Sequence, residues 1–157
     1  MVSYDDVAKS IVTFVRDAAK PVIIPINKKS KICMMNVPDS ISDKSETPLC
    51  VVRMISSEER VYRDGTDCPP TYANITIGCI ILGDTFTVVQ KIKNAIMETW
   101  RKTRRISLYR FAEQDNPIEQ VGTILNKGES STSIPGELRF PVREVDSITF
   151  SIRVKMS

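Results

Sequence analysis

The residues of this chain that could carry out chemistry are its acids and its cysteines, because histidine is absent. Without histidine, the usual general base for a serine or cysteine nucleophile is missing, and so is the commonest nitrogen ligand for zinc, copper or iron. Two carboxylate pairs remain, Glu58 with Glu59 and Asp64 with Asp67, in a polar stretch typical of solvated loops. The sequence also has no glycine-rich loop at phosphate-binding spacing. We therefore predict that the chain is not an enzyme and uses no cofactor.

The four cysteines are spread along the first half of the chain, at Cys33, Cys50, Cys68 and Cys79. No two are close enough to form the Cys-x-x-Cys pair that is typical of zinc sites. All except Cys68 lie in apolar runs, where a reduced cysteine behaves as a small hydrophobic residue. We interpret them as buried thiols rather than as metal ligands or a disulfide.

Composition predicts one globular domain in the cytosol. The chain has 157 residues, of which 41% are hydrophobic and 26% charged, as in ordinary folded domains. Its longest apolar run, residues 75–82, is far shorter than the roughly 20 residues that span a bilayer. The first residues are acidic, at Asp5 and Asp6, where a secretory signal would be basic.

Positive charge is concentrated in one segment. The whole chain has 22 basic and 19 acidic residues, yet residues 85–110 contain a single acid, Glu98. The basic side chains of this segment are Lys91, Lys93, Arg101, Lys102, Arg104, Arg105 and Arg110. Such a cluster predicts an anionic partner, either a phospholipid surface or the RNA of a nucleocapsid. Cations at the end of a helix also offset its dipole, which accounts for two or three of these charges without any partner.

Apolar periodicity predicts two helices. Residues 4–20 repeat apolar positions at helical spacing, with Ser3 as N-cap and Pro21 as the stop. A second amphipathic helix is expected over residues 85–103, beginning at Asp84 or Thr87, with Trp100 on its apolar face.

Short β-type runs make up most of the remaining chain. Strands are expected at residues 22–26, 32–37, 49–55, 72–82, 106–111, 121–125, 138–142 and 148–154. Residues 143–147 are expected to join the last two as a hairpin, residues 27–31, 38–48 and 56–71 to form loops, and residues 126–135 to form a mobile loop. We therefore predict a single α+β domain over residues 1–157, with a mostly antiparallel sheet, an N-terminal helix and a central helix.

A proline motif precedes one of these strands. Pro69, Pro70 and Tyr72 match the Pro-Pro-x-Tyr pattern whose polyproline II backbone binds WW domains. The two prolines also suit a rigid approach to the strand at residue 72, so both interpretations stay open.

The combination of a proline motif, a Trp-containing helix, a basic turn and a following strand resembles the matrix proteins of negative-strand RNA viruses, rhabdoviruses in particular. The resemblance covers residues 69–111 and, more loosely, the C-terminal strands. It implies that Pro69, Pro70 and Tyr72 recruit host ubiquitin ligases for budding. It also implies that Lys91, Lys93, Arg101, Lys102, Arg104 and Arg105 contact membrane and nucleocapsid.

Three classes of function follow. The first is a self-associating, non-enzymatic matrix-like protein in the host cytoplasm, at the inner face of a membrane or in the virion, with no small-molecule substrate. The second is a single-stranded-RNA-binding viral accessory protein, such as a movement protein or silencing suppressor. The third is a plain protein-interaction module, in which the basic cluster acts only as a helix cap and solvated face.

Overall fold

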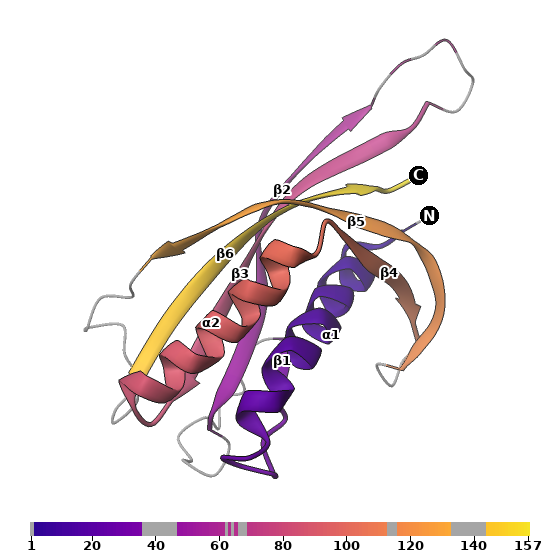
Figure 1. Ribbon diagram of the computed structural model, residues 1–157. Helices are drawn as coiled ribbons and strands as arrows, with labels where there is room; N and C mark the ends of the chain where they lie inside the picture. The colour runs from indigo at the N-terminus through magenta and orange to yellow at the C-terminus, as the bar shows by residue number, and fades with distance from the viewer. Residues whose placement is uncertain are drawn as a thin grey trace.

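The computed structural model describes residues 2–35, 47–61, 63, 65, 69–112, 116–132 and 144–157. Over these residues the chain forms a single α+β domain, in which a six-stranded sheet curls around two helices (Figure 1). The elements in chain order are α1 (Tyr4–Ile23), β1 (Cys33–Met35), β2 (Leu49–Val61), β3 (Thr71–Gly83), α2 (Phe86–Lys102), β4 (Arg105–Phe111), β5 (Pro117–Thr132) and β6 (Glu144–Lys155). The predicted fold class is confirmed.

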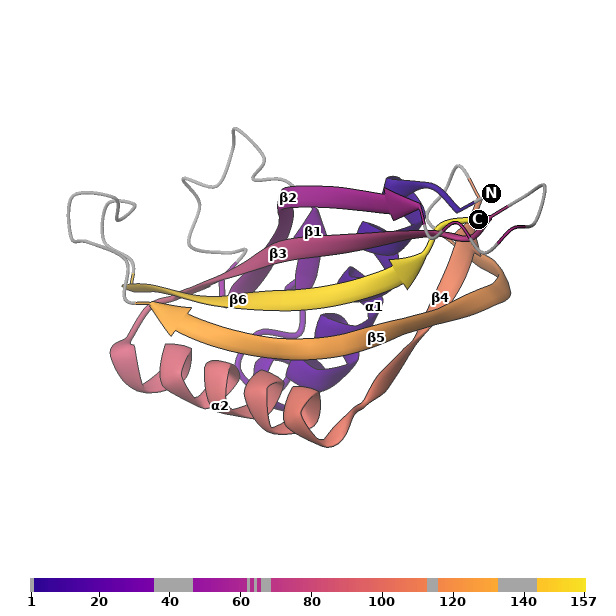
Figure 2. The same cartoon turned by 90° about the horizontal axis from the view of Figure 1, so that it is seen from above.

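The sheet has the strand order β1-β2-β3-β6-β5-β4. Its strand pairs are antiparallel except β1 with β2, which is parallel. Figure 2 shows the long central strands bending together over the helices, with β4 curling back toward α1. The two termini lie side by side, since the Val2 N–H donates to the Met156 carbonyl at 3.1 Å.

Helix α1 begins at the predicted N-cap, where the Ser3 side chain accepts from the Asp6 N–H at 3.1 Å. The prediction that Pro21 ends the helix is wrong, because α1 runs through Pro21 to Ile23. A proline this close to the end removes only one helical hydrogen bond. That loss is offset because Ile23 is fully buried and the Ile24 N–H still reaches the Lys20 carbonyl at 3.1 Å. The strand predicted at residues 22–26 is therefore the end of a helix and a turn.

Helix α2 has Thr85 as its N-cap, neither Asp84 nor Thr87, since the Thr85 side chain accepts from the Val88 N–H at 3.3 Å. One face of the helix is buried against the sheet, and Trp100 is the largest side chain on that face. Trp100 stacks on Phe150 of β6, with ring centroids 4.1 Å apart, and meets Phe14 of α1 edge-on at 5.6 Å. The prediction that Trp100 belongs to the core is confirmed.

Several strands are longer than their apolar runs. Residues 56–61 continue β2, and residues 126–132 belong to β5, so the loops predicted there are wrong over these residues. The β2–β3 pair projects past the rest of the sheet, where polar side chains on both faces hide the alternation that marks a half-buried strand (Figure 1). In β5, a bulge at Gly128, whose φ is +122°, interrupts the alternation of side chains between the two faces of the sheet.

The C-terminal strand β6 starts at Glu144, so residues 144–147 are strand and not part of a hairpin link. Residues 36–37, the predicted strand at 138–142 and residues 133–135 of the predicted mobile loop lie outside the described residues. The strand predicted at residues 32–37 matches β1 only from Cys33 to Met35, because Ile32 precedes the strand with a φ of +68°. The remaining strand predictions fall within β2, β3, β4, β5 and β6.

Three of the cysteines, Cys33, Cys50 and Cys79, are buried and free, as predicted, while Cys68 lies outside the described residues. Burial raises the pKa of the Cys33 thiol. A hydrogen bond with the Cys79 thiol, together with burial, raises the pKa of Cys50. Thiols with raised pKa values stay protonated at neutral pH, so Cys33 and Cys50 are packing groups rather than nucleophiles.

The indole N–H of Trp100 is buried and has no hydrogen-bond partner in the described part of the chain. We therefore predict that Trp100→Ala lowers the free energy of unfolding by about 3–5 kcal/mol, because it leaves a cavity between both helices and the sheet. Trp100→Phe should cost much less, since it keeps a ring and loses no hydrogen bond. Urea denaturation followed by circular dichroism measures both variants, and equal losses would contradict the packing role of the Trp100 ring.

Candidate anionic-partner interface

Helix α2 and the turn into β4 position the seven predicted basic residues. The buried side chains of α2 are Val89, Ile92, Ile96 and Trp100, which fix the face of the helix that meets the sheet. Lys91, Arg101 and Lys102 are consequently exposed, as are Arg104, Arg105 and Arg110 after the helix. Lys93 differs, because its side chain is only 12% exposed.

Four of the seven cations lie against carboxylates. Three of these pairs are at the surface and have short N–O distances: Arg101 with Glu129 at 2.6 Å, Lys102 with Glu98 at 2.9 Å, and Arg110 with Glu119 at 2.7 Å. Surface pairs of this kind stabilise a fold by less than about 1 kcal/mol each, but they reduce the net charge offered to a partner.

The fourth pair joins α2 to β6 below the surface. Lys93 Nζ donates to Asp146 Oδ2 at 2.8 Å, and Gln90 Nε2 donates to the same oxygen at 2.8 Å. Burial raises the pKa of Asp146, but hydrogen bonds from Lys93, Gln90 and the Ser147 N–H outweigh it and hold the pKa below its ordinary value. Lys93 therefore acts as a link between helix and sheet, and little of its charge is exposed to a partner.

Of the seven predicted basic residues, the exposed ones without a carboxylate partner among the described residues are Lys91, Arg104 and Arg105. The two arginines occupy a turn that Asn126 of β5 holds in place. Asn126 Nδ2 donates to the carbonyls of Trp100 at 2.8 Å and Thr103 at 2.9 Å, and the Asn126 N–H donates to the Arg104 carbonyl at 3.0 Å. The guanidinium groups thus extend from a fixed backbone.

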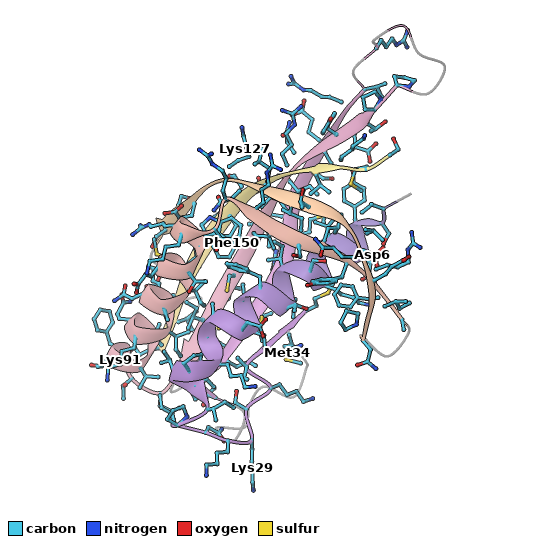
Figure 3. The ribbon with its side chains drawn as sticks, turned by 45° about the vertical axis from the view of Figure 1, so that its right-hand side comes forward. Asp6, Lys29, Met34, Lys91, Lys127 and Phe150 are labelled. Atoms are coloured by element: carbon cyan, nitrogen blue, oxygen red, sulfur yellow. The ribbon has the colours of Figure 1, made fainter. Side chains whose placement is uncertain are left out.

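Lys127 follows Asn126 and is also exposed. Sequence reasoning missed it, because β5 is distant in sequence from α2 and meets the helix end only in the fold. Lys127 lines a hollow with residues of β2, β3 and β6, whereas Arg105 lines one between α1 and β4. We therefore define the arginine turn as Arg104 and Arg105 alone. Lys91 lies in the second turn of α2, well apart from Lys127 in Figure 3.

A second group of exposed lysines was not singled out from the sequence. Lys28, Lys29 and Lys31 lie on the turns that follow α1, and each is without a carboxylate partner in the part of the chain that the structure describes. The run Lys-Lys-Ser-Lys is visible in the sequence, but its position between two elements predicts only a solvated loop.

The proline motif lies at the start of β3. Pro69 and Pro70 are half-buried, and Tyr72 is the second residue of the strand, with the Arg153 guanidinium 4.6 Å from its ring centroid. Tyr72 pairs with Arg60 on one side and Lys155 on the other. A WW domain that binds Pro69, Pro70 and Tyr72 therefore requires the first residues of β3 to leave the sheet.

Among the described residues, no three His, Cys, Asp or Glu side chains come together as a metal-binding group. Neither of the helices in this part of the chain is long and apolar enough to cross a membrane. Comparison with models of known protein families finds no match for this chain, and comparison with curated proteins finds no significant match.

We predict that Lys93→Ala lowers the free energy of unfolding by about 3 kcal/mol or more, because it leaves the Asp146 carboxylate buried without its cation. The matched control is Lys91→Ala, two residues earlier on the exposed side of α2, which should change stability by less than about 0.5 kcal/mol. Urea denaturation measures both, and similar effects would contradict the buried pair.

The pair of Lys93 and Asp146 should also make the stability of the fold depend on pH in the acidic range. Since its folded-state pKa is depressed, Asp146 adds stability above the unfolded value of about 3.9, and this stability is lost as pH falls through the lower folded-state pKa. Asp146→Asn lacks a titrating group, so its stability should fall less than that of the wild type between pH 7 and pH 3. Parallel denaturation curves at the two pH values measure the difference, and an equal fall in both proteins would argue against it.

Proposed function

We propose that this chain is a non-enzymatic, viral matrix-like assembly protein that binds anionic membrane, nucleocapsid, or both. The observation that carries the proposal is the arginine turn. Arg104 and Arg105 are exposed, lack a carboxylate partner among the described residues, and extend from a backbone that Asn126 holds. A guanidinium that extends from a held backbone can bind two phosphate oxygens at once through its planar set of donors.

The strength expected of such a surface supports an assembly role. Each Lys or Arg contributes roughly 1 kcal/mol near an anionic leaflet, so the two cations of the arginine turn bind weakly in a single molecule. An array of molecules on one surface binds firmly through multivalency. Self-association of the chain, in the host cytoplasm and at the inner face of the membrane or virion, is therefore part of the proposal.

The proline motif adds a host partner to this proposal. Pro69, Pro70 and Tyr72 suit a WW domain once the first residues of β3 have left the sheet. Because these residues are at the end of the strand, their release leaves the remainder of β3 paired with β2 and β6.

A single-stranded-RNA-binding accessory protein is the second candidate, and one observation favours it. Arg105 and Tyr109 line a shallow hollow of about 240 Å³ between α1 and β4. An aromatic ring beside a guanidinium suits a stacked base and its phosphate. Asp17 in the same hollow opposes a polyanion, so we rank this function below the first.

To test the proposal, one preparation is sedimented with phosphatidylserine-containing vesicles and with single-stranded RNA, at low and high salt. The wild type should bind at least one of them, more weakly at high salt. Arg104→Gln with Arg105→Gln should weaken at least one of these two interactions by roughly tenfold or more, since each cation contributes about 1 kcal/mol.

The control is Arg53→Gln with Lys155→Gln, which removes the same charge from two other exposed positions. It should weaken binding clearly less than the change at the arginine turn. A wild type that binds neither vesicles nor RNA would mean that the chain is a plain protein-interaction module.

A further inference from the structure

Two large apolar side chains are exposed near the end of α1 and the start of α2. Ile26, on the turn after α1, is 50% exposed, and Phe86, the first residue of α2, is 67% exposed. Figure 1 shows the end of α1 and the start of α2 at the same edge of the fold. Single exposed apolar side chains are common on protein surfaces, so the charges around these two decide what they indicate.

A chain of hydrogen bonds connects the turn that carries Ile26 with the segment that precedes Phe86. Asn27 Nδ2 donates to the Thr47 carbonyl at 2.9 Å, and Thr47 Oγ1 donates to Asp84 Oδ1 at 3.1 Å. Asn27 follows Ile26, and Asp84 comes two residues before Phe86. The middle residue, Thr47, is only 3% exposed, so the link is internal rather than a loose surface contact.

The turn that carries Ile26 is held from its other side as well. Ser30 Oγ donates to the Pro48 carbonyl at 2.6 Å, and the Lys29 N–H donates to Asn27 Oδ1 at 3.0 Å. Ile23, three residues before Ile26, is fully buried in the core. These contacts hold the backbone of the turn in place, so Ile26 is exposed on an ordered turn.

We define the lysine-rich end as the turn residues 25–31 with the first turns of α2. Its exposed cations, joined by one from the last turn of α1, are Lys20, Lys28, Lys29, Lys31 and Lys91. The described acids at this end are Asp84, which accepts from Thr47, and Glu144, which pairs in the sheet with Gly83. Figure 3 places Lys29 and Lys91 at this end. Among the described residues, cations exceed acids at this end, and none of the five cations has a carboxylate partner there.

We propose that the lysine-rich end docks on an anionic lipid bilayer, with Ile26 and Phe86 inserted at the headgroup boundary and the lysines around them facing lipid phosphates and carboxylates. Aliphatic and aromatic side chains beside lysines are the combination that interfacial anchoring uses. A nucleic acid would gain nothing from Ile26, and these cations are all lysines, whereas paired phosphate recognition favours arginine.

This inference rests on the proposed function and names the lipid-contacting site within it. Helix α2 has 17 residues and is about 25 Å long, which separates Phe86 from the arginine turn beyond its other end. A molecule seated on lipid through its lysine-rich end therefore presents Arg104 and Arg105 away from the bilayer. One chain can then contact a membrane at one end and a second polyanion at the other.

The test is vesicle flotation of the full chain with phosphatidylcholine alone and with phosphatidylcholine plus phosphatidylserine. Wild type should float only with the anionic vesicles. Ile26→Ser with Phe86→Ser, and separately Lys28→Glu with Lys29→Glu and Lys31→Glu, should each reduce flotation at least roughly tenfold. Circular dichroism confirms that each variant is folded.

Two controls separate binding at this end from a general effect of exposed apolar groups or of positive charge. Ile118→Ser removes an apolar side chain that is 63% exposed on β5 and should leave flotation unchanged. Arg104→Gln with Arg105→Gln should lower vesicle binding clearly less than the lysine changes. If only the arginine variant loses vesicle binding, the lysine-rich end is not the lipid site, although the proposed function stands. If the wild type does not float but binds RNA, both the lipid site and the membrane part of the proposed function are wrong.

Insertion can be measured directly with Phe86→Trp. Trp100 is fully buried, so a brominated lipid should quench the new indole and leave the native one largely unaffected. Strong quenching in anionic vesicles supports insertion. Binding without any quenching would overturn it and reduce the contact to surface charge.

Discussion

Helix α1 holds the two edges of the curled sheet together, and the rest of the structure depends on this bridge. On one side, the Ser10 hydroxyl accepts from the Tyr109 N–H of β4 at 3.0 Å, and Asp6 accepts from the Phe111 N–H at 3.3 Å. On the other side, Arg16 Nη2 donates to the Cys33 carbonyl of β1 at 2.9 Å. The edges of an open sheet expose backbone N–H and C=O groups that need hydrogen-bond partners. Side chains of α1 supply some of these partners at both edges. Because one helix contacts both edges, it also helps to set the curvature of the sheet.

The second helix lies in the hollow that this curvature leaves. Trp100 fills the space between α2, Phe14 of α1 and Phe150 of β6, so one aromatic group joins both helices to the sheet. The pair of Lys93 and Asp146 fixes the first half of α2 to β6, and Asn126 fixes its end. The orientation of α2 decides which of its cations face solvent. Packing therefore sets the charge pattern of the surface.

Much of the fold could be predicted from residue pattern, and the failures have local physical reasons. Apolar spacing identified both helices and the central strands because their buried faces repeat at 3.6 or 2 residues. The ends of β2 and β5 were missed because side chains such as Glu58 and Lys127 are exposed and carry no alternation. The prediction that Pro21 ends the first helix was wrong because a proline costs less helix stability near the end of a helix than in its middle. Burial of Ile23 extends α1 past Pro21. The candidate site was predicted only in part, since the seven basic residues, close in sequence, differ in burial and in their carboxylate contacts within the described ranges.

The sequence by itself determined which chemical groups the protein has and their local order. It has no histidine, its cysteines lie in apolar runs, and a helix is followed by a run of cations. These are properties of residue type and local spacing, which are encoded position by position. Only the tertiary structure decided which cations meet carboxylates, because Glu129 and Asp146 come from strands far along the chain. It also brought Ile26 and Phe86 to one end through Thr47, since a hydrogen bond between distant segments depends on the fold and leaves no periodic signal in the sequence.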